Sequence, residues 1–226
     1  MRRNLLLLIA LSLGTSVGAV PTAAEVGLEV VWKRPLGSGY SGIAVADGRA
    51  VTMFSDGRFD YVIALEAETG EERWRFRLGT TYSGRGGSEN GPSSTPVVDG
   101  GVVFGLAPKG LLFAITLADG NPVWTRKIDE DFQLTIPLFG MVTTPLVEDD
   151  VLIVQTGNPD EGAISGFDKQ TGKTLWSVGS DTVGYQSPKV MTLAGQRQVI
   201  AVGDTTVMGI LPRSGEILWT HEYGEG

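Results

Sequence analysis

The chain has 226 residues, of which 42% are hydrophobic, so it is long enough to bury a sizeable core in one large or two small domains. It contains no cysteine, which excludes disulfides, thiol catalysis, cysteine-based zinc sites and a lipid-modified N-terminal cysteine. The formal net charge of −8, with no cluster of Lys or Arg, argues against nucleic acid and anionic lipid as partners.

Residues 1–24 have the anatomy of a secretory signal peptide. Two arginines precede an apolar run over residues 5–13, and small residues follow. This run is too short to cross a bilayer, which takes about 20 apolar residues, so no membrane span is predicted. Cleavage is expected after Ala19 or Ala24, and an uncleaved anchor is the alternative. The mature chain is expected to be exported, either to a bacterial periplasm or out of the cell.

Residues 28–36 are predicted to form a strand that ends at Pro35, because proline cannot donate to a strand ladder. Trp32 lies in this segment, but the Thr-Gly turn that precedes the later tryptophans is missing. We interpret the segment as the orphan outer strand of a unit whose first strands lie elsewhere.

The rest of the chain repeats a unit of four short strands four times. Each strand is rich in β-branched or aromatic residues and is bounded by Gly or Asp turn residues. No segment beyond the leader shows a sustained period of 3.6 residues, so no helix is predicted. The units cover about residues 39–78, 92–128, 141–178 and 185–222, with strands at 42–46, 50–54, 61–65 and 72–78; 95–98, 102–106, 111–116 and 122–128; 144–147, 151–156, 163–167 and 174–178; and 188–191, 198–202, 206–211 and 216–222.

One motif recurs near the end of each unit: a small residue stands ten positions before a Trp, and a Gly stands four before it. The Gly is expected to close a hairpin in a left-handed conformation. The Trp is expected to cover the junction with the adjoining unit and to donate its indole N–H to a backbone carbonyl there, while the small residue leaves room for a neighbour. A ring that stacks on a cofactor or sugar is the alternative. The residues are Ala64, Gly70 and Trp74; Ala114, Gly120 and Trp124; Gly166, Gly172 and Trp176; and Gly209, Gly215 and Trp219.

Four short antiparallel strands in each repeat indicate a β-propeller blade. A single blade cannot bury both faces of its sheet, so blades must stack around an axis. There are five Trp-bearing segments but only four sets of first strands. The predicted fold is therefore all-β, an open arc of four blades, which C-terminal blades or a second copy of the chain would complete. A closed four-bladed ring with a spare strand is the alternative.

The repeated motif resembles the tryptophan-docking repeat of the PQQ-like, quinoprotein-type β-propellers, a family that includes the outer-membrane assembly factor BamB and related exported propellers. Smaller pieces ahead of the first strands agree with it, namely residues 39–41, 91–96, 144–145 and 187–188. The resemblance covers nearly all of residues 28–226. It implies a ring of seven or eight blades, about half of which would be missing here.

For the enzymes of this family, the resemblance implies PQQ on the axis, a bound Ca²⁺, an Asp base and often a disulfide between adjacent cysteines. The chain has no cysteine, and no residue can be matched to the base or the metal ligands. The acidic loops lack the spacing of a calcium loop, and the only histidine, His221, has no partner for catalysis. We therefore expect no catalytic residue, no metal and no cofactor. A fragment of a PQQ-dependent alcohol or sugar dehydrogenase is the alternative.

The connections between units, residues 79–94, 129–143 and 179–187, are expected to gather on the face where the innermost strands begin. They would carry groups suited to a peptide or small polar ligand, unless these groups merely satisfy the loop backbone. The predicted function is a non-catalytic scaffold of the cell envelope that binds a protein partner or a small polar ligand; by resemblance, a protein partner would be a component of outer-membrane biogenesis. A secreted polymer-binding propeller is a further alternative. The ligand-face residues are Tyr40, Arg85, Asn90, Thr143, Tyr185 and Gln186.

Overall fold

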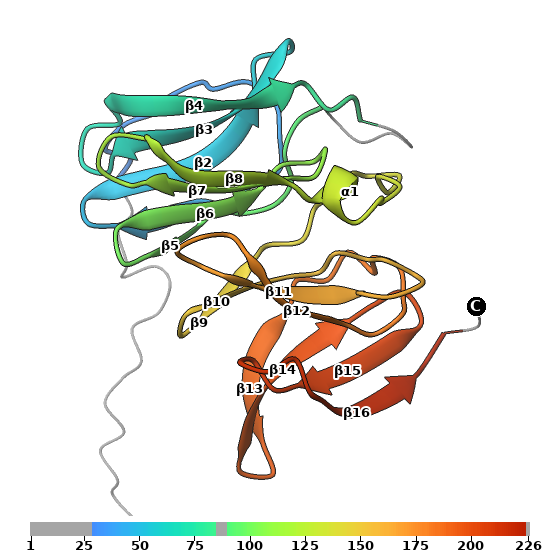
Figure 1. Ribbon diagram of the computed structural model, residues 1–226. Coiled ribbons are helices and arrows are strands. Elements are labelled where there is room, and N and C mark those ends of the chain that lie inside the picture. Colours follow the sequence, from blue (N-terminus) through green and yellow to red (C-terminus); the bar gives the residue numbers. More distant parts are fainter. Residues whose placement is uncertain (1–28, 85–89, 225–226) are drawn as a thin grey trace, which may run out of the picture. The chain divides into compact units, whose positions relative to one another are not determined.

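The computed structural model describes residues 29–84 and 90–224 (Figure 1). The predicted signal peptide and Arg85 lie outside these residues. The chain divides into two units, residues 1–31 and residues 32–226, and all strands belong to the second. Within the described residues, no helix is long and apolar enough to cross a membrane.

Four antiparallel sheets of four strands each make up the second unit, and their colours in Figure 1 follow the chain from blue to red. In every sheet the strands are paired in chain order, which confirms the predicted all-β fold, an open arc of propeller blades. The first blade contains β1 (Ala44–Ala46), β2 (Arg49–Ser55), β3 (Phe59–Glu66) and β4 (Glu72–Thr80); the second β5 (Val97–Asp99), β6 (Val102–Leu106), β7 (Leu111–Thr116) and β8 (Pro122–Lys127); the third β9 (Leu146–Glu148), β10 (Val151–Val154), β11 (Ile164–Asp168) and β12 (Thr174–Val178); and the fourth β13 (Lys189–Leu193), β14 (Gln196–Val202), β15 (Thr206–Ile210) and β16 (Ile217–Glu222).

The blades bury their apolar side chains against each other, so that the core is divided into layers between neighbouring blades. Val51 and Val62 of the first blade pack with Phe113 of the second. Phe104 of the second blade packs with Phe167 of the third. A third cluster joins the third and fourth blades, through Ile153, Ile164, Val199, Met208 and Ile210. Each interior blade therefore buries both faces of its sheet, as stacking requires.

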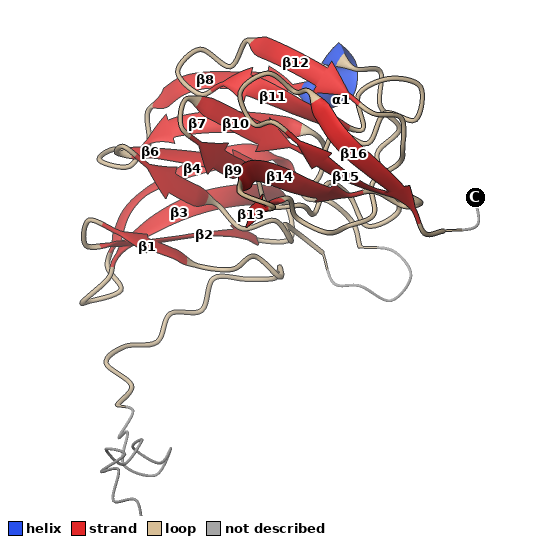
Figure 2. Ribbon diagram, turned by 90° about the horizontal axis from the view of Figure 1, so that it is seen from below, coloured by secondary structure: helices blue, strands red, loops and turns tan. Residues whose placement is uncertain are grey.

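The structure corrects two predictions about local conformation. A short helix, α1 (Ile128–Asp131), follows β8, although no helix was expected (Figure 2). Four residues are too few to show a helical period in the sequence, and the fully buried Ile128 is compatible with the end of a strand as well as with this turn. The other correction concerns residues 29–36, which form no strand: a strand needs a hydrogen-bonded neighbour, and none of the four described sheets includes these residues.

Candidate functional site

The outer edges of neighbouring blades are joined by the repeated tryptophans. The indole Nε1 of Trp74 donates to Leu117 O of the next blade at 2.8 Å, and Trp124 donates to Lys169 O at 3.0 Å. Trp176 donates to Pro212 O at 3.0 Å. In every case the acceptor stands three residues before the repeated glycine of that next blade.

The repeated glycine serves two purposes at each junction. Gly120 has φ +73°, a conformation that favours glycine, and closes the turn between β7 and β8. A Cβ atom at Gly120 would also lie 2.7 Å from the ring of Trp74, and the same holds for Gly172 and the ring of Trp124. The Trp ring of the preceding blade thus packs directly against the backbone of this glycine.

The small residue ten positions before each Trp makes room within its own blade, where the neighbour that fills the space is that Trp. Ala64 is paired with Trp74 across β3 and β4, and Gly166 with Trp176 across β11 and β12. A Cβ atom on Gly166 would collide with the ring of Trp176. Each Trp ring therefore lies over the small residue of its own sheet and against the glycine of the next.

The two ends of the series differ. Trp32 donates to Ala67 O at 2.9 Å and lies against Gly70. It therefore fills the position on the first blade that the Trp of a preceding blade would fill. Trp219, in the fourth blade, is 36% exposed and donates at 2.7 Å to Gln198 Oε1 of its own sheet.

The inner edges of the blades are linked by hydroxyl groups at the starts of the first strands. The backbone N–H of Gly42 donates to Thr95 Oγ1 at 3.1 Å, and the N–H of Thr95 donates to Thr144 Oγ1 at 3.1 Å. The N–H of Thr144 donates to Ser187 Oγ at 2.9 Å. These hydroxyls precede the prolines of the Thr-Pro and Ser-Pro pairs, whose purpose the sequence left open. One hydrogen bond therefore joins each blade to the next near the axis.

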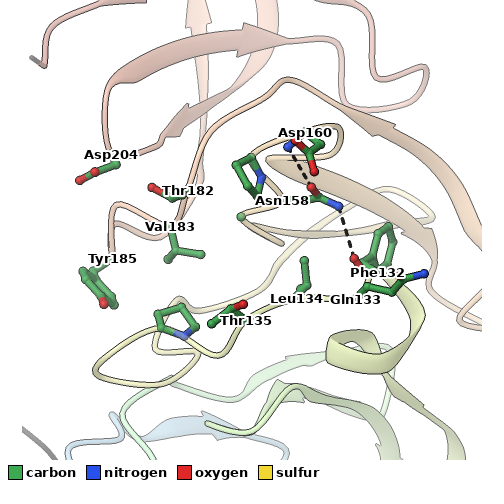
Figure 3. A pocket seen from close by; sticks show the side chains of 13 residues that line it. Phe132, Gln133, Leu134, Thr135, Asn158, Asp160, Thr182, Val183, Tyr185 and Asp204 are labelled. Atoms are coloured by element: carbon green, nitrogen blue, oxygen red, sulfur yellow. Dashed lines mark hydrogen bonds between the residues drawn. The ribbon is translucent and has the colours of Figure 1, made fainter. Parts of the chain in front are cut away.

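A pocket of about 790 Å³ lies among the loops that carry the long connections between blades (Figure 3). One wall is the segment after α1, and another is the loop between β10 and β11. The remaining wall comes from the connection between the third and fourth blades and from the turn before β15. The lining residues are Phe132, Gln133, Leu134, Thr135, Pro137, Gly157, Asn158, Pro159, Asp160, Thr182, Val183, Tyr185 and Asp204.

Polar side chains hold these walls together. Asp181, which is 7% exposed, accepts the backbone N–H groups of Thr205 at 3.1 Å and Thr206 at 2.8 Å, so the connection carrying Thr182 is fixed to the turn carrying Asp204. Asn158 Nδ2 donates to Phe132 O at 3.4 Å across the pocket wall. The pocket is thus built from segments that are tied to the blades.

An aromatic hollow of about 370 Å³ borders the pocket and shares Tyr185 with it. Phe139 and Tyr185 meet edge to face there, with ring centroids 5.5 Å apart and an interplanar angle of 65°. Both rings are more than a third exposed, and Tyr40 is 57% exposed. The hollow is lined by Tyr40, Tyr82, Gly91, Ser93, Phe139, Val142 and Tyr185.

A buried carboxylate lies behind this hollow. Asp60 is 2% exposed, and its Oδ2 accepts the backbone N–H of Tyr82 at 3.0 Å. Its Oδ1 has no hydrogen-bond partner among the described residues. Burial raises the pKa of the Asp60 carboxyl above its ordinary value, and the bond from the Tyr82 N–H opposes this only in part.

The structure brings together only some of the residues expected on the ligand face. Tyr40 and Tyr185 both line the hollow. Thr143 is 1% exposed, and Asn90 Oδ1 accepts the Gly84 N–H at 2.9 Å. Gln186 is exposed and lines neither cavity, and Arg85 lies outside the described residues.

Sequence reasoning missed most of the pocket. Asn158 and Asp160 belong to a loop that was examined only for metal spacing, and Gln133 belongs to a connection in which only Thr143 was predicted to face a ligand. One local signal is visible in the backbone: Gln133 and Tyr185 have φ values of +53° and +61°, which are uncommon for residues with a side chain. Such conformations cannot be read from residue type.

The lining of the pocket does not fit the quinone cofactor of the related enzymes. PQQ carries carboxylates, whereas the charged lining residues, Asp160 and Asp204, are both acidic, and no lining residue is basic. In the described part of the chain, no group of three or more His, Cys, Asp or Glu side chains is arranged to hold a metal ion.

Comparison with known proteins decides the family. A family model described as "Outer membrane protein assembly factor BamB" matches residues 23–136 and 83–226, which together span most of the chain. The chain belongs to this family of PQQ-like β-propellers.

Two curated relatives show how far the sequences have diverged. The assembly factor BamB of Burkholderia pseudomallei is 28% identical over 178 residues, covering 77% of this chain and 40% of the relative. BamB of Shigella dysenteriae is 28% identical over 203 residues, covering 76% and 50%. The chain therefore spans half or less of the length of these curated relatives.

A solved structure of a europium-containing methanol dehydrogenase is similar in fold. It has a TM-score of 0.56 and 16% sequence identity, and the likeness covers 80% of this chain and 41% of the enzyme. At this identity the likeness shows the propeller fold alone.

Proposed function

We propose that the chain is a non-catalytic scaffold of the bacterial cell envelope that binds a partner protein in outer-membrane protein assembly. The observation that carries this proposal is the match to the assembly-factor family over nearly the whole chain. The names of the curated relatives, which are outer membrane protein assembly factors, support the envelope location and the class of partner.

The loop face is the surface proposed to meet the partner. It carries the pocket and the aromatic hollow, whereas the opposite ends of the blades consist of short turns. Loops on a rigid scaffold are where proteins most often place binding residues. The acidic lining of the pocket supports a binding role over quinone chemistry, because it would repel the carboxylates of PQQ.

The same proposal includes further blades that cover the fourth blade. The exposed Trp219 supports this, because its counterparts in the other blades are covered by a neighbour. A second copy of the chain is a weaker candidate, because Trp32 already occupies the Ala67 and Gly70 position that Trp219 of another copy would need. Light scattering tests this point: a stable dimer with a protected Trp219 would favour the second copy.

Site-directed photo-crosslinking in a bacterial envelope tests the scaffold. A photoreactive residue at Tyr185 is expected to capture an outer-membrane assembly component, identified by mass spectrometry. The matched control is the same residue at Gln170, which is exposed in the turn at the other end of β11. Equal capture from both positions would contradict the proposal. So would dye-linked alcohol or sugar oxidation by the purified protein after addition of PQQ and Ca²⁺.

A further inference from the structure

We infer that the pocket and the aromatic hollow together bind a basic peptide segment, with a lysine or arginine side chain in the pocket and a neighbouring apolar or aromatic side chain in the hollow. This inference rests on the proposed function, because it specifies which chemistry a partner must present to the loop face. It concerns two adjoining cavities with different linings.

Charge favours a cation in the pocket. Asp160 and Asp204 both line it and are exposed, and neither takes part in an ion pair with a described residue. No Lys, Arg or His side chain is among the lining residues. Two carboxylates without an internal counter-ion attract a positive group and repel an anion, and the whole chain adds a net charge of −8 to this field.

The uncharged lining can also satisfy a basic side chain. Thr135, Thr182 and Gln133 also line the pocket and offer hydroxyl and amide oxygens there. A guanidinium has five N–H donors in a fixed plane and an ammonium has three, so either group needs several acceptors at once. A cavity of about 790 Å³ has room for such a side chain together with water.

The hollow supplies the second half of the recognition. Apart from the tyrosine hydroxyls and Ser93, its lining is apolar, with Phe139 and Tyr185 forming an edge-to-face pair. Its volume of about 370 Å³ suits one large side chain. An aromatic side chain of the ligand would extend the existing ring pair.

Tyr185 is the reason for assigning both parts to one ligand. It lines both cavities, so a charged group in the pocket and an apolar group in the hollow lie next to each other across one ring. Adjacent side chains of a peptide have this arrangement. A free polyamine would use the carboxylates but not the hollow, and an apolar ligand would use the hollow but not the carboxylates.

Fluorescence anisotropy of a labelled peptide with one arginine followed by phenylalanine tests the inference on the full chain. Asp160→Asn combined with Asp204→Asn is expected to weaken binding about tenfold and to reduce its dependence on salt. Tyr185→Ala is expected to weaken binding by a similar factor. The matched charge control is Asp47→Asn combined with Glu68→Gln, two exposed acidic residues in turns at the other end of the first blade, and it should leave binding unchanged.

Changes in the peptide complete the test. Replacing the arginine by glutamate should abolish binding, and replacing the phenylalanine by glycine should weaken it in the parent chain but not further in Tyr185→Ala. Spermidine should compete weakly and independently of Tyr185. Equal binding of the arginine and glutamate peptides, or spermidine binding as tight as that of the peptide, would overturn the inference. If crosslinking from Tyr185 succeeds while the peptide fails, only this inference is lost and the proposed scaffold function stands.

Discussion

The first and last junctions of the propeller show what a neighbouring blade does to the same sequence motif. Trp74 is 8% exposed and donates to Leu117 O of the second blade. Trp219 occupies the same place in its own sheet, paired with a small residue, but it is 36% exposed and donates to Gln198. The motif positions the ring within the blade, and the next blade supplies the acceptor and the cover.

The side chains beside the two rings also differ in burial. Val51, which is paired with Ala64 beside Trp74, is fully buried by the second blade. Ile200 stands at the corresponding place beside Gly209 and is only partly buried. Nearby, Met191 is 48% exposed. The fourth blade therefore leaves the apolar side chains of Ile200, Met191 and Trp219 less covered than their counterparts in the first blade, as an open site for a further blade would.

The largest expected effect is the difference in free energy of unfolding between a variant without the Trp74 ring and one without the Trp219 ring. Trp74→Ala leaves a cavity between two blades and removes a buried indole hydrogen bond, so it should lower the free energy of unfolding by about 3–5 kcal/mol. Trp219→Ala should cost about 1 kcal/mol, because the ring is partly in solvent already. Urea unfolding of both variants measures this. Equal losses would show that Trp219 is covered in solution.

The glycine under the ring provides a second, smaller test. Gly120→Ala introduces a Cβ atom 2.7 Å from the Trp74 ring at a φ of +73°. Gly101→Ala is the matched control, because its φ is +77° and nothing lies within 4 Å of the added atom. The control should lose about 1–2 kcal/mol from backbone strain alone. Gly120→Ala should lose about 1–3 kcal/mol more, because the ring must shift. Similar losses would mean that only the turn conformation matters.

The inner edge is expected to contribute less than the outer one. Thr144→Val keeps the shape of the side chain but removes the hydroxyl that accepts the Thr95 N–H of the second blade. The lost hydrogen bond should lower the free energy of unfolding by about 1–2 kcal/mol. Thr192→Val, in the exposed strand β13, is the control and should change stability by less than about 0.5 kcal/mol. If Thr144→Val left the free energy of unfolding unchanged, the hydroxyl hydrogen bonds would not stabilise the junctions between blades.

The repeated parts of the molecule could be predicted from the sequence, and the parts that break the repeat could not. The sixteen described strands could be predicted from runs of β-branched residues between turns, because the four blades repeat the same pattern of residues and pack in the same way. Position within the blade does not reveal which side chain fills the space over the small residue, so the sequence alone did not identify that neighbour as the Trp of the same blade. The hydrogen bonds from backbone N–H groups to hydroxyls of the next blade depend on how the blades are placed against each other. No local sequence pattern predicts that placement.

The candidate site was less predictable for the same reason. Tyr40 and Tyr185 were placed on the loop face because long connections gather there, and both line the hollow. Asp204 comes from a short turn of the fourth blade, and its own N–H donates to Thr182 O while Asp181 accepts the N–H groups of Thr205 and Thr206 in the same turn. The loops differ in sequence from blade to blade, so the conformation of one loop cannot be predicted from that of another.

The smallest expected effect is spectroscopic and sharpens the comparison without disturbing the fold. Acrylamide quenches exposed indoles more than buried ones, and Trp219 is more exposed than Trp74 or Trp176, which are both 8% exposed. Trp219→Phe should therefore remove the more readily quenched, longer-wavelength part of the emission, while Trp176→Phe should leave that part in place. Quenching that Trp219→Phe does not reduce would mean that the face of the fourth blade is already covered in solution. Light scattering on the same sample then identifies the cover, since a second copy doubles the mass and a rearrangement within one chain does not.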